Sequence, residues 1–360
     1  MQLSVVLPTY NEKENIPIIC ERLQKALKNI EYEIIIVDDN SPDGTYQAAL
    51  ELSESQPHIL PIKRVHEKGL SSAVVRGFSV ARGKYLAVMD ADLQHDETIL
   101  PTMLAEFEKG SDLVIGSRKV EGGGIENWSA IRKFISWGAT LLAKIMLPYK
   151  LSDPMSGFFA IRKSTYEQVA DKVNPRGFKI LLELVNRARD ARISEVGFVF
   201  KPRVHGESKL SGKVMIQYLV ALYDLRFGRI LPIRFIKFGM VGSTGVLVNE
   251  GGLWFGLNVL GWQESYALAL GIEISIITNF LLNNFYTFRD VKLTGFLPFI
   301  RGLITFNLIC SAGAVVNYAV ALFTKEKLGI TIYAGNLLGI LAATAWNYLI
   351  NFQITWKGAK

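Results

Sequence analysis

The chain has few of the residues that build disulfide frameworks and zinc sites. It contains two cysteines and four histidines in 360 residues, and Cys20 and Cys310 lie far apart in stretches with helical patterns. We therefore expect neither disulfide bonds nor a Cys/His metal centre, and the two thiols fit small core residues. The N-terminal stretch has no basic leader, and its apolar run is too short for a signal peptide. This predicts that the N-terminal domain stays in the compartment where it is made.

Two common phosphate-binding motifs are also absent. No glycine-rich dinucleotide fingerprint follows the first apolar run, and no Gly-Lys-Ser/Thr loop occurs anywhere. A bound nucleotide would therefore have to be held by carboxylates and a metal ion. The net charge of +7 favours anionic partners, but the basic residues gather before and between apolar runs. This pattern argues against nucleic acid and favours a membrane surface or phosphate groups.

Apolar residues are present in excess, and they divide the chain. Hydrophobic residues make up 49% of the sequence and the mean hydropathy is +0.23, which is high for a soluble protein. Residues 1–230 have the composition of an ordinary mixed domain, whereas long apolar runs dominate from about residue 232. The division predicts a soluble part followed by a membrane-embedded helical part.

In the first part, short β-branched runs alternate with helical patterns every 20 to 30 residues. The predicted strands cover Leu3–Leu7, Glu33–Val37, Ile59–Val65, Tyr85–Met89 and Leu113–Gly116. Asn11 is expected to cap a first helix, and residues 69–81 are expected to form another. The alternation indicates an α/β fold with a doubly wound, mostly parallel sheet, which binds ligands at the carboxyl ends of its strands.

One strand end carries an unusual set of oxygen groups. The run Tyr85–Met89 ends in Asp90, Ala91 and Asp92, with Gln94 two positions further on. On an extended segment Asp90 and Asp92 point to the same side, and Gln94 continues that row if the extension persists. Such oxygen ligands suit Mg²⁺ or Mn²⁺ holding a diphosphate. The alternative is a solvated turn followed by a helix cap.

Two other predicted strand ends are polar. Tyr10 and Glu12 follow the first strand, and Asp38 and Asp39 follow the second on a turn rich in Ser, Pro and Gly. Acidic groups there can accept hydrogen bonds from a base and from ribose hydroxyls, while a cation neutralises the diphosphate. The three strand ends together indicate recognition of a nucleotide-sugar.

Seven motifs in consistent order extend this interpretation. They are LPTYNE at 7–12, VDDNSPDGT at 37–45, KGLSSAVVRGF at 68–78, MDADLQH at 89–95, VIGSR at 114–118, SDPMSGFFAIR at 152–162 and RVHGESKL at 203–210. The set resembles the dolichol-phosphate mannose synthases, which are inverting, Rossmann-like GT-A-fold glycosyltransferases. The resemblance covers about residues 3–230. It implies transfer of a hexose from a nucleotide-sugar, GDP-mannose in that family, to dolichyl or another polyprenyl phosphate.

The resemblance also implies a donor site. Asp92 and Gln94 would hold Mg²⁺ or Mn²⁺ under the leaving diphosphate, with Asp90 nearby. Lys209, on a loop rich in Gly and Ser, would close over the diphosphate. The residues expected around the nucleotide-sugar are Pro8, Tyr10, Glu12, Val37, Asp39, Asp90, Ala91 and Asp92. The residues expected to be catalytic are Asp90, Asp92, Arg118 and Arg203.

The implied acceptor is a lipid phosphate that is already anionic, so no side chain has to remove a proton from it. Repulsion between two anions predicts arginines around the acceptor. The expected set is Arg118, Arg132, Ser136 and Arg203. For each basic residue the alternative is a solvated surface charge. His95 and His205 fit polar loop groups better than metal ligands.

Two amphipathic stretches precede the long apolar runs. Residues 127–147 combine tryptophans with basic edges, and residues 213–229 form a second such stretch. Docking at a bilayer surface fits the first stretch, and core packing explains it equally well. We divide the chain into a catalytic domain over residues 1–212, amphipathic linker helices over 213–231 and a membrane domain over 232–360.

The membrane domain offers four apolar spans, at about 234–257, 266–288, 299–323 and 331–353. Each is long enough to cross a bilayer. Lys237, Glu250, Glu273 and Arg301 interrupt them, so the spans are expected to pack polar faces together or to place charges near their ends. Lysine and arginine gather before the first span, between the second and third, and after the fourth. This predicts a multi-pass protein with both termini and the catalytic domain in the cytoplasm.

The spans repeat internally at a shift of 68 residues. The shift aligns Gly245, Asn249, Gly271, Asn279, Asn283 and Thr287 with Gly313, Asn317, Gly339, Asn347, Asn351 and Thr355. It predicts two tandem two-helix hairpins of one orientation, with hydrogen bonds between asparagines at matching depths. A lipid or sugar pathway is the alternative role for these asparagines. This half resembles the GtrA-like membrane family.

Two alternative functions stay open. A polyprenyl-phosphate glucosyltransferase that uses UDP-glucose belongs to the same class. A flippase of lipid-linked sugars would use the soluble part only for regulation, and the intact acidic strand ends argue against it. Processive polysaccharide synthases share the early motifs, but their Gln-x-x-Arg-Trp signature is absent.

Overall fold

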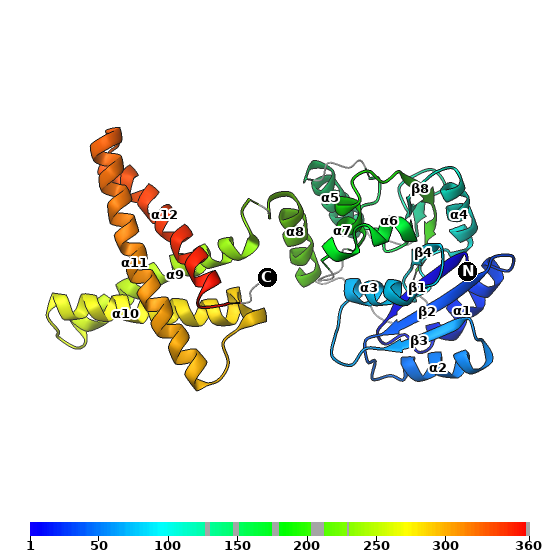
Figure 1. The fold of residues 1–360 in the computed structure, drawn as a ribbon, viewed down its shortest axis with the longest axis horizontal. Coiled ribbons are helices and arrows are strands. Elements are labelled where there is room, and N and C mark those ends of the chain that lie inside the picture. Colours follow the sequence, from blue (N-terminus) through cyan, green and yellow to red (C-terminus); the bar gives the residue numbers. More distant parts are fainter. Residues whose placement is uncertain (127–129, 147–150, 175–179, 203–211, 229, 358–360) are drawn as a thin grey trace. The chain divides into compact units, whose positions relative to one another are not determined.

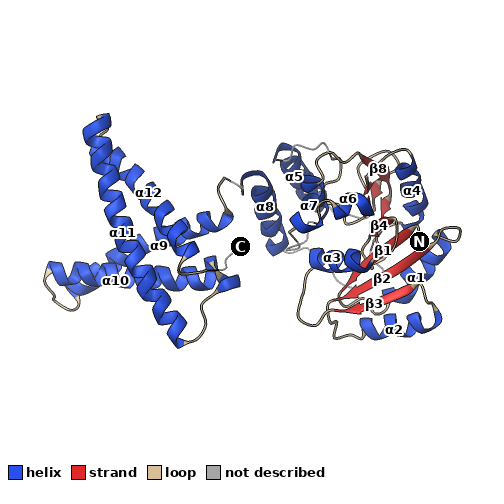
Figure 2. Cartoon of the chain, viewed as in Figure 1, coloured by secondary structure: helices blue, strands red, loops and turns tan. Residues whose placement is uncertain are grey.

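The computed structural model describes residues 1–126, 130–146, 151–174, 180–202, 212–228 and 230–357. These residues form two compact units, Met1–Arg226 and Phe227–Lys360. Figure 1 shows the first unit in blue to green and the second in yellow-green to red. The strands that the structure describes belong to the first unit (Figure 2).

A mixed sheet forms the centre of the first unit. Among the described residues it has seven strands, in the order β3-β2-β1-β4-β7-β5-β8. Their bounds are β1 Leu3–Thr9, β2 Tyr32–Asp38, β3 Ile59–Lys63, β4 Tyr85–Val88, β5 Leu113–Ser117, β7 Phe159–Arg162 and β8 Ile193–Gly197. Strand β7 is antiparallel to its neighbours β4 and β5, and the other pairs are parallel. The carboxyl ends of β1, β2, β4 and β5 and the amino end of β7 therefore share one edge of the sheet.

Helices cover both faces of this sheet. Their bounds are α1 Asn15–Ala26, α2 Thr45–Ser55, α3 Leu70–Val80, α4 Leu100–Glu108, α5 Ala130–Met146, α6 Lys163–Glu167, α7 Ile180–Arg187 and α8 Gly212–Phe227, with 3-10 turns at Glu97–Ile99 and Ala170–Lys172. Helices α1 and α4 pack on the face that carries Val5, and α3 and α7 pack on the face that carries Val6. Neighbouring residues of a strand thus enter two different cores, as expected for a sheet covered on both sides.

The predicted strands lie within two residues of β1 to β5, but β7 and β8 were not predicted. Strand β7 enters the sheet by pairing Phe159 with both Val88 and Ile115. The predicted helix cap at Asn11 is wrong, because α1 begins at Asn15. Asn11 instead adopts a left-handed conformation with φ of 57°, which asparagine tolerates, and its N–H donates to the Ser41 hydroxyl at 2.9 Å.

A second, two-stranded sheet joins β6 Gly124–Ile125 to β9 Val199–Phe200. It follows β5 and β8, and it brings Phe198 and Phe200 into the core cluster that also contains Phe158. The segment after β9 thereby reaches the edge of the main sheet, where the N–H of Lys201 donates to the carbonyl of Gln94 at 3.0 Å.

The second unit is helical where it is described. Its helices are α9 Ile233–Asn258, α10 Glu264–Leu282, α11 Phe296–Leu328 and α12 Ile332–Gln353, with a π-helical turn at Asn283–Thr287 and a 3-10 turn at Arg289–Val291. The helices coincide with the four predicted apolar runs. Two described segments, Glu264–Thr287 and Phe296–Leu328, are long and apolar enough to count as candidate membrane spans.

The two hairpins, α9 with α10 and α11 with α12, make equivalent contacts at the shift of 68 residues. A Cβ on Gly245 would lie 2.4 Å from Nδ2 of Asn279, and one on Gly313 would lie 2.3 Å from Oδ1 of Asn347. Gly271 and Gly339 meet Asn249 and Asn317 in the same way. Each asparagine thus lies over a glycine of the neighbouring helix, where a larger residue would not fit.

The predicted hydrogen bonds between paired asparagines are not formed in the described part of the chain. Oδ1 of Asn249, Asn279, Asn317 and Asn347 is buried without a hydrogen-bond partner. Asn283 and Asn351 donate to carbonyls of their own helices at 2.9 and 2.8 Å. The asparagines therefore act mainly through close packing against glycine.

Six aromatic side chains join the two hairpins, and they form three pairs at the same shift: Phe238 and Phe306, Phe280 and Tyr348, Phe288 and Trp356. Phe288 stacks on Trp356 with ring centroids 4.3 Å apart. Phe238 meets Tyr348 at 5.7 Å, and Phe306 meets Phe280 at the same distance. Each hairpin therefore offers the other the same contacts, as in an isologous dimer.

The polar contacts do not all follow this symmetry. Asn307 of α11 donates a hydrogen bond to the carboxylate of Glu273 on α10 at 2.9 Å. At a shift of 68 residues the corresponding positions are Leu341 and Gly239, which cannot form that bond. The contact between α10 and α11 is therefore polar, whereas its counterpart between α12 and α9 lacks these groups.

Two adjacent glycines of α9 provide a test of the hairpin packing. A Cβ on Gly252 would lie 2.7 Å from Cα of Gly271, whereas a Cβ on Gly251 would have no neighbour within 4 Å. We expect Gly252→Ala to lower the unfolding free energy by about 1–3 kcal/mol, because it forces two backbones apart. Gly251→Ala should be neutral or slightly stabilising, because alanine favours helix. Thermal unfolding of the full chain in detergent measures both, and equal melting temperatures would contradict this packing.

Candidate active site

Strand β4 leads into a tight turn at the edge of the sheet. The strand ends at Val88, and Leu93 has a left-handed φ of 63°. Asp90, Asp92 and Gln94 therefore do not form the extended row that the sequence predicted. Asp92 and Gln94 are buried, whereas the side chain of Asp90 is 38% exposed. Oδ1 of Asp92 accepts a hydrogen bond from the N–H of Gln94 at 3.2 Å, which closes the turn locally.

The side chain of Gln94 has a defined orientation. Its Nε2 donates to the carbonyl of Lys201 at 2.9 Å, so its amide oxygen lies on the opposite side of the group. That oxygen is a hard donor, like the carboxylates of Asp90 and Asp92. In the described ranges no group of three or more His, Cys, Asp or Glu could hold a metal ion by itself. The donor set fits Mg²⁺ or Mn²⁺ that takes further ligands from a diphosphate.

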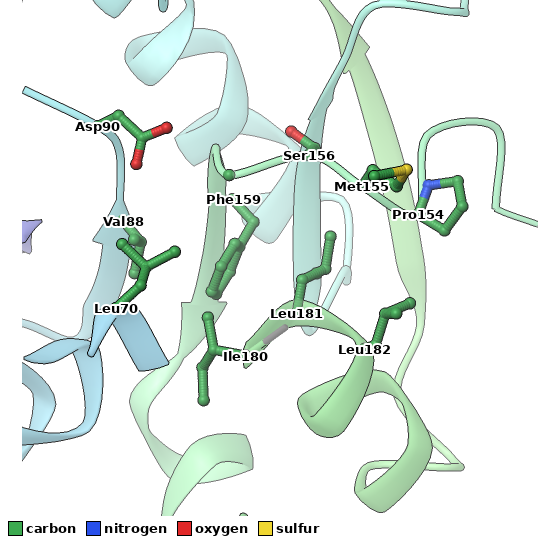
Figure 3. A pocket seen from close by; sticks show the side chains of 11 residues that line it. Leu70, Val88, Asp90, Pro154, Met155, Ser156, Phe159, Ile180, Leu181 and Leu182 are labelled. Atoms are coloured by element: carbon green, nitrogen blue, oxygen red, sulfur yellow. The ribbon is translucent and has the colours of Figure 1, made fainter. Parts of the chain in front are cut away.

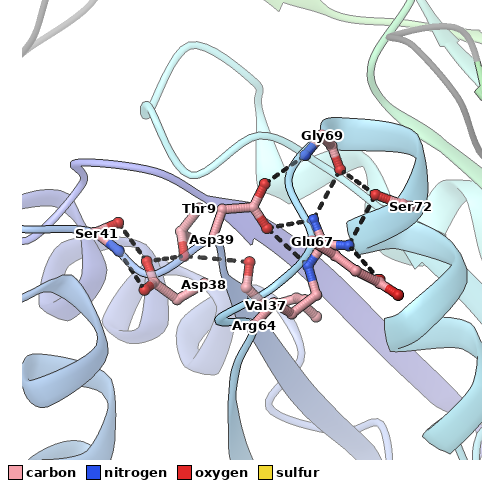
Figure 4. Close-up of polar contacts among 9 residues, drawn as sticks. All are labelled: Thr9, Val37, Asp38, Asp39, Ser41, Arg64, Glu67, Gly69 and Ser72. Atoms are coloured by element: carbon pink, nitrogen blue, oxygen red, sulfur yellow. Dashed lines mark hydrogen bonds and ion pairs between the residues drawn. The ribbon is translucent and has the colours of Figure 1, made fainter. Parts of the chain in front are cut away.

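Asp38 is the last residue of β2 and Asp39 follows it, and both have structural partners (Figure 4). Asp38 is fully buried and accepts a hydrogen bond from the Thr9 hydroxyl at 3.2 Å. Asp39 forms an ion pair with the buried Arg64, whose Nε and Nη2 both donate to Oδ1, and its Oδ2 accepts the N–H of Gly69 at 2.7 Å. The pair fixes the loop between β3 and α3 against β2. If Asp39 also contacts a base or ribose, as predicted, its carboxylate must accept that hydrogen bond in addition to those from Arg64 and Gly69.

The other residues of the predicted donor site lie near the same edge. Pro8 and Val37 are register partners on β1 and β2. Tyr10 is 39% exposed, and Nζ of Lys68 lies 5.6 Å from the centre of its ring. The carboxylate of Glu12 accepts a hydrogen bond from the first residue of α1 at 2.7 Å. The sheet thus gathers at one edge Pro8, Tyr10, Glu12, Val37, Asp39, Asp90, Ala91 and Asp92.

Arg118 follows β5 and is paired with Asp153. Its Nε and Nη2 lie 2.6 and 2.7 Å from the two carboxylate oxygens, and its backbone N–H donates to the same group at 3.2 Å. Burial opposes the charge of Asp153, but hydrogen bonds and the charge of Arg118 lower its pKa below the usual value. The carboxylate therefore stabilises the fold at neutral pH, and this contribution is lost as the pH falls through the lowered pKa. Removing either partner would cost about 3–5 kcal/mol by leaving a buried charge.

A second cation lies close to this pair. Lys119, which the sequence analysis did not select, donates to the hydroxyl of Thr140 on α5. Burial lowers the pKa of Lys119. Thr140 in turn donates to the carbonyl of Ser136, one helical turn earlier, at 2.8 Å. The structure therefore connects Ser136 to the end of β5 through Thr140 and Lys119.

Some predicted site residues lie outside the described part of the chain. They are Arg203, His205 and Lys209, together with the side chain of Arg132, whose backbone belongs to α5. Their predicted roles remain predictions.

A narrow cavity lies beside Asp90 (Figure 3). It is lined mainly by apolar side chains from β4, β7 and α7, such as Val88, Phe159 and Leu181. Its volume of about 30 Å³ gives room for a water molecule but not for a sugar ring. A hexose would therefore have to lie outside this cavity, on the exposed side of Asp90.

Sequence reasoning missed two partners that support this edge, Arg64 and Asp153, and it expected His95 to be a polar loop group, whereas its ring is buried. Nδ1 of His95 accepts the N–H of Asp90 at 3.1 Å, and burial lowers the pKa of His95 to about 4, so the ring is neutral at neutral pH. His95 and Asp153 both belong to motifs that carried the family resemblance. Their place in these motifs was the available signal, but their partners could not be deduced from spacing.

Helix α5 combines a packed face with an exposed apolar face. Ala139 and Ala143 are buried with Tyr218 and Leu222 of α8, and the Tyr218 hydroxyl donates to the carbonyl of Ala139 at 2.7 Å. The large apolar residues of the helix point elsewhere, and Phe134, Trp137 and Ile145 are 59–70% exposed. Core packing thus explains the small residues of α5, whereas the exposed aromatic and aliphatic face fits a bilayer surface.

Comparison with known sequences identifies both units. The family described as "Glycosyl transferase family 2" matches residues 4–170, and "GtrA/DPMS, transmembrane domain" matches residues 237–356. Together with the mixed sheet, the first match confirms the predicted GT-A-like α/β fold, and the second shows that this is a membrane protein.

Three relatives carry the comparison further. The dolichol-phosphate mannosyltransferase of Pyrococcus furiosus is 44% identical over 358 residues, which cover 99% of this chain and 99% of that protein. The enzyme of the same name from Saccharomyces cerevisiae is 41% identical over 66% of this chain and 93% of its own length. The undecaprenyl-phosphate mannosyltransferase of Micrococcus luteus is 37% identical over 61% of this chain and 92% of its own length. Because the first likeness extends through both units, the chain belongs to the dolichol-phosphate mannosyltransferases and is a membrane-embedded family 2 glycosyltransferase.

Proposed function

We propose that the protein transfers mannose from GDP-mannose to dolichyl or another polyprenyl phosphate, with inversion at the sugar carbon. The observation that supports this proposal most is that acidic groups and a guanidinium group lie at the same edge of the sheet, one strand apart. The oxygen-rich turn Asp90–Gln94 follows β4, and the guanidinium of Arg118 follows β5, with β7 alone between those two strands. The names of the three relatives support mannose as the sugar and a polyprenyl phosphate as the acceptor.

The donor end of the site is the turn after β4. Asp92 and Gln94 would hold Mg²⁺ or Mn²⁺, which supplies positive charge to the departing diphosphate. Asp90, the most exposed of the three side chains, would contact the sugar or the cation. Pro8, Tyr10, Glu12, Val37 and Asp39 would border the nucleoside on the neighbouring strands. No carboxylate has to act as a base, because the lipid phosphate is already anionic.

The acceptor end lies beyond β5. Arg118 is held in one orientation by both oxygens of Asp153, so its guanidinium is preorganised. Ser136 and Lys119 lie near Arg118, and both form hydrogen bonds with Thr140. Arg132, Arg203 and Lys209 complete the proposed set, with Lys209 on the diphosphate. The exposed apolar face of α5 would lie at the bilayer surface, where the lipid phosphate is found.

We further propose that α9 to α12 cross the membrane as four spans, with the catalytic unit and both termini in the cytoplasm. The lysines and arginines between α10 and α11 and around the two ends of the second unit support this orientation. In this arrangement residues 1–212 form the catalytic domain, residues 213–231 form the linker and residues 232–360 form the membrane domain. Helix α8 would lie at the membrane surface.

The transfer reaction itself is the first test. Full-length protein given GDP-mannose, Mn²⁺ and a short polyprenyl phosphate should form lipid-linked mannose, detected by mass spectrometry. Asp92→Asn should lower kcat/KM by at least about 10²-fold, because it removes the charge that holds the cation. Asp190→Asn, the same change at an exposed position, should leave it unaltered. UDP-glucose is offered in competition, and a preferred glucosyl product would support the alternative donor. Wild-type turnover of Asp92→Asn would exclude this metal site.

The acceptor role of Arg118 is tested by Arg118→Lys. Lysine keeps the positive charge but cannot form the fork with Asp153, so its charge is less well placed for a phosphate. We expect kcat/KM for the polyprenyl phosphate to fall about tenfold, with little change in KM for GDP-mannose. Arg189→Lys, at an exposed position after α7, serves as the control. Equal effects on both substrates would argue against an acceptor role.

The orientation of the membrane unit is tested with two reporters in sealed vesicles. One reporter is placed at the C-terminus and the other between α9 and α10, within residues 259–263. Four spans with cytoplasmic termini predict that the two reporters lie on opposite sides of the membrane, with the C-terminal one in the cytoplasm. Protease accessibility of both reporters from the same side would overturn this arrangement.

A further inference from the structure

His95 lies in an aromatic enclosure behind the turn after β4. Its side chain is 3% exposed, and its ring centroid lies 5.3, 5.5 and 5.6 Å from those of Phe158, Phe198 and Phe200. A polar ring in such surroundings is costly unless it forms hydrogen bonds, because water cannot reach it. The two ring nitrogens therefore need an explanation.

Both ring nitrogens face Asp90. Nδ1 accepts the backbone N–H of Asp90 at 3.1 Å, and Nε2 lies 4.0 Å from Oδ2 of the same residue. Because Nδ1 is the acceptor, a neutral ring carries its proton on Nε2, on the side of the carboxylate. One side chain thus contacts both the backbone and the carboxylate of a residue five positions earlier.

The turn is therefore fixed at both of its ends. His95 holds Asp90 at the start, and the two hydrogen bonds between Gln94 and Lys201 hold the end. Between these supports, Leu93 adopts a left-handed conformation, and the N–H of Gln94 donates to Oδ1 of Asp92 across it. Such a conformation persists only where its surroundings hold it.

A glycine from a distant motif completes the arrangement. A Cβ on Gly157 would lie 3.1 Å from Oδ2 of Asp90 and 3.5 Å from Cε1 of His95. The first distance is tighter than ordinary contact, so a methyl group there would press on the carboxylate. Gly157 therefore leaves the space in which the carboxylate of Asp90 and the imidazole of His95 lie together.

We propose that His95 is a positioning residue of the transferase, which sets the geometry of Asp90 and Asp92 toward the metal-bound nucleotide by accepting the Asp90 N–H within an aromatic enclosure. The proposal rests on the proposed function of that turn. It differs from simple core packing, in which the ring would matter only for its volume. It also differs from a ligand role, since Nδ1 accepts the Asp90 N–H and Nε2 of the neutral ring carries the proton.

Two substitutions distinguish the role of His95 as a hydrogen-bond acceptor from its role as a ring that fills space. His95→Phe keeps an aromatic ring in the enclosure but leaves the Asp90 N–H without its acceptor. His95→Asn loses the ring but keeps an acceptor oxygen close to the position of Nδ1. A packing role predicts that Phe is tolerated and Asn is harmful, whereas a positioning role predicts the reverse for metal and nucleotide binding. Gly157→Ala perturbs the same carboxylate from the other side.

The experiment measures Mn²⁺-dependent GDP binding by the full-length protein, along with turnover and thermal unfolding. We expect His95→Phe to fold but to weaken Mn²⁺·GDP binding and lower kcat by about 10–100-fold, the range typical of residues that orient metal ligands. His95→Asn should remain within about tenfold of wild type in binding, even with a lower melting temperature. Gly157→Ala should weaken binding while GDP binding without metal stays unchanged.

Each outcome decides the proposal. Wild-type Mn²⁺·GDP binding by His95→Phe would overturn it, while Asp92→Asn, measured alongside, shows independently whether the metal site exists. If Asp92→Asn binds Mn²⁺·GDP like wild type, the proposed metal site fails and this proposal fails with it. If His95→Phe does not fold, His95→Asn decides, because loss of its binding at retained fold would contradict the acceptor role.

Discussion

Carboxylates gathered at one edge of a sheet repel one another unless each has a donor of its own, and this constraint organises the first unit. The parallel strands β2 and β4 carry Asp38, Asp39 and Asp90 to the same edge, and Asp153 joins them beside β5. Their partners differ in kind. Hydroxyl and amide groups serve Asp38, the guanidinium of Arg64 serves Asp39, a backbone-bound imidazole lies against Asp90, and Arg118 pairs with Asp153. Each of these carboxylates therefore lies beside a group that offsets the repulsion from its neighbours.

The same edge separates two tasks that a reaction between anions needs. A cation at the end of β4 would neutralise the leaving group, and a guanidinium at the end of β5 would neutralise the nucleophile. Strand β7 lies between them, so the two strand ends are about two strand spacings, or roughly 10 Å, apart. That separation is on the scale of one sugar ring with a phosphate on either side. The antiparallel strand thus contributes distance as well as packing, and its leading segment supplies Asp153 and Gly157 to the two ends.

The sequence predicted those features that depend on neighbours along the chain. An apolar run followed by carboxylates located the turn after β4, and identical residues at a constant shift located the two hairpins. Features that depend on partners far apart in sequence were not predictable. Nothing local indicates that Phe159 pairs with Val88 or that Arg64 occupies Asp39. Asn11 is not a cap because its left-handed φ turns the chain before the helix, which begins only at Asn15, and the row from Asp90 to Gln94 is not extended because Leu93 reverses the chain.

Each of the two hairpins in the second unit makes the same aromatic contacts to the other. A strictly symmetric pair of hairpins would expose two identical sides to the surrounding lipid. The bond between Glu273 and Asn307 exists on one side only, since its counterparts are Leu341 and Gly239. The two sides of this unit are therefore chemically different, although the aromatic cluster between them remains paired. Another molecule can therefore distinguish one side from the other, so the duplicated unit is directional despite its internal repeat.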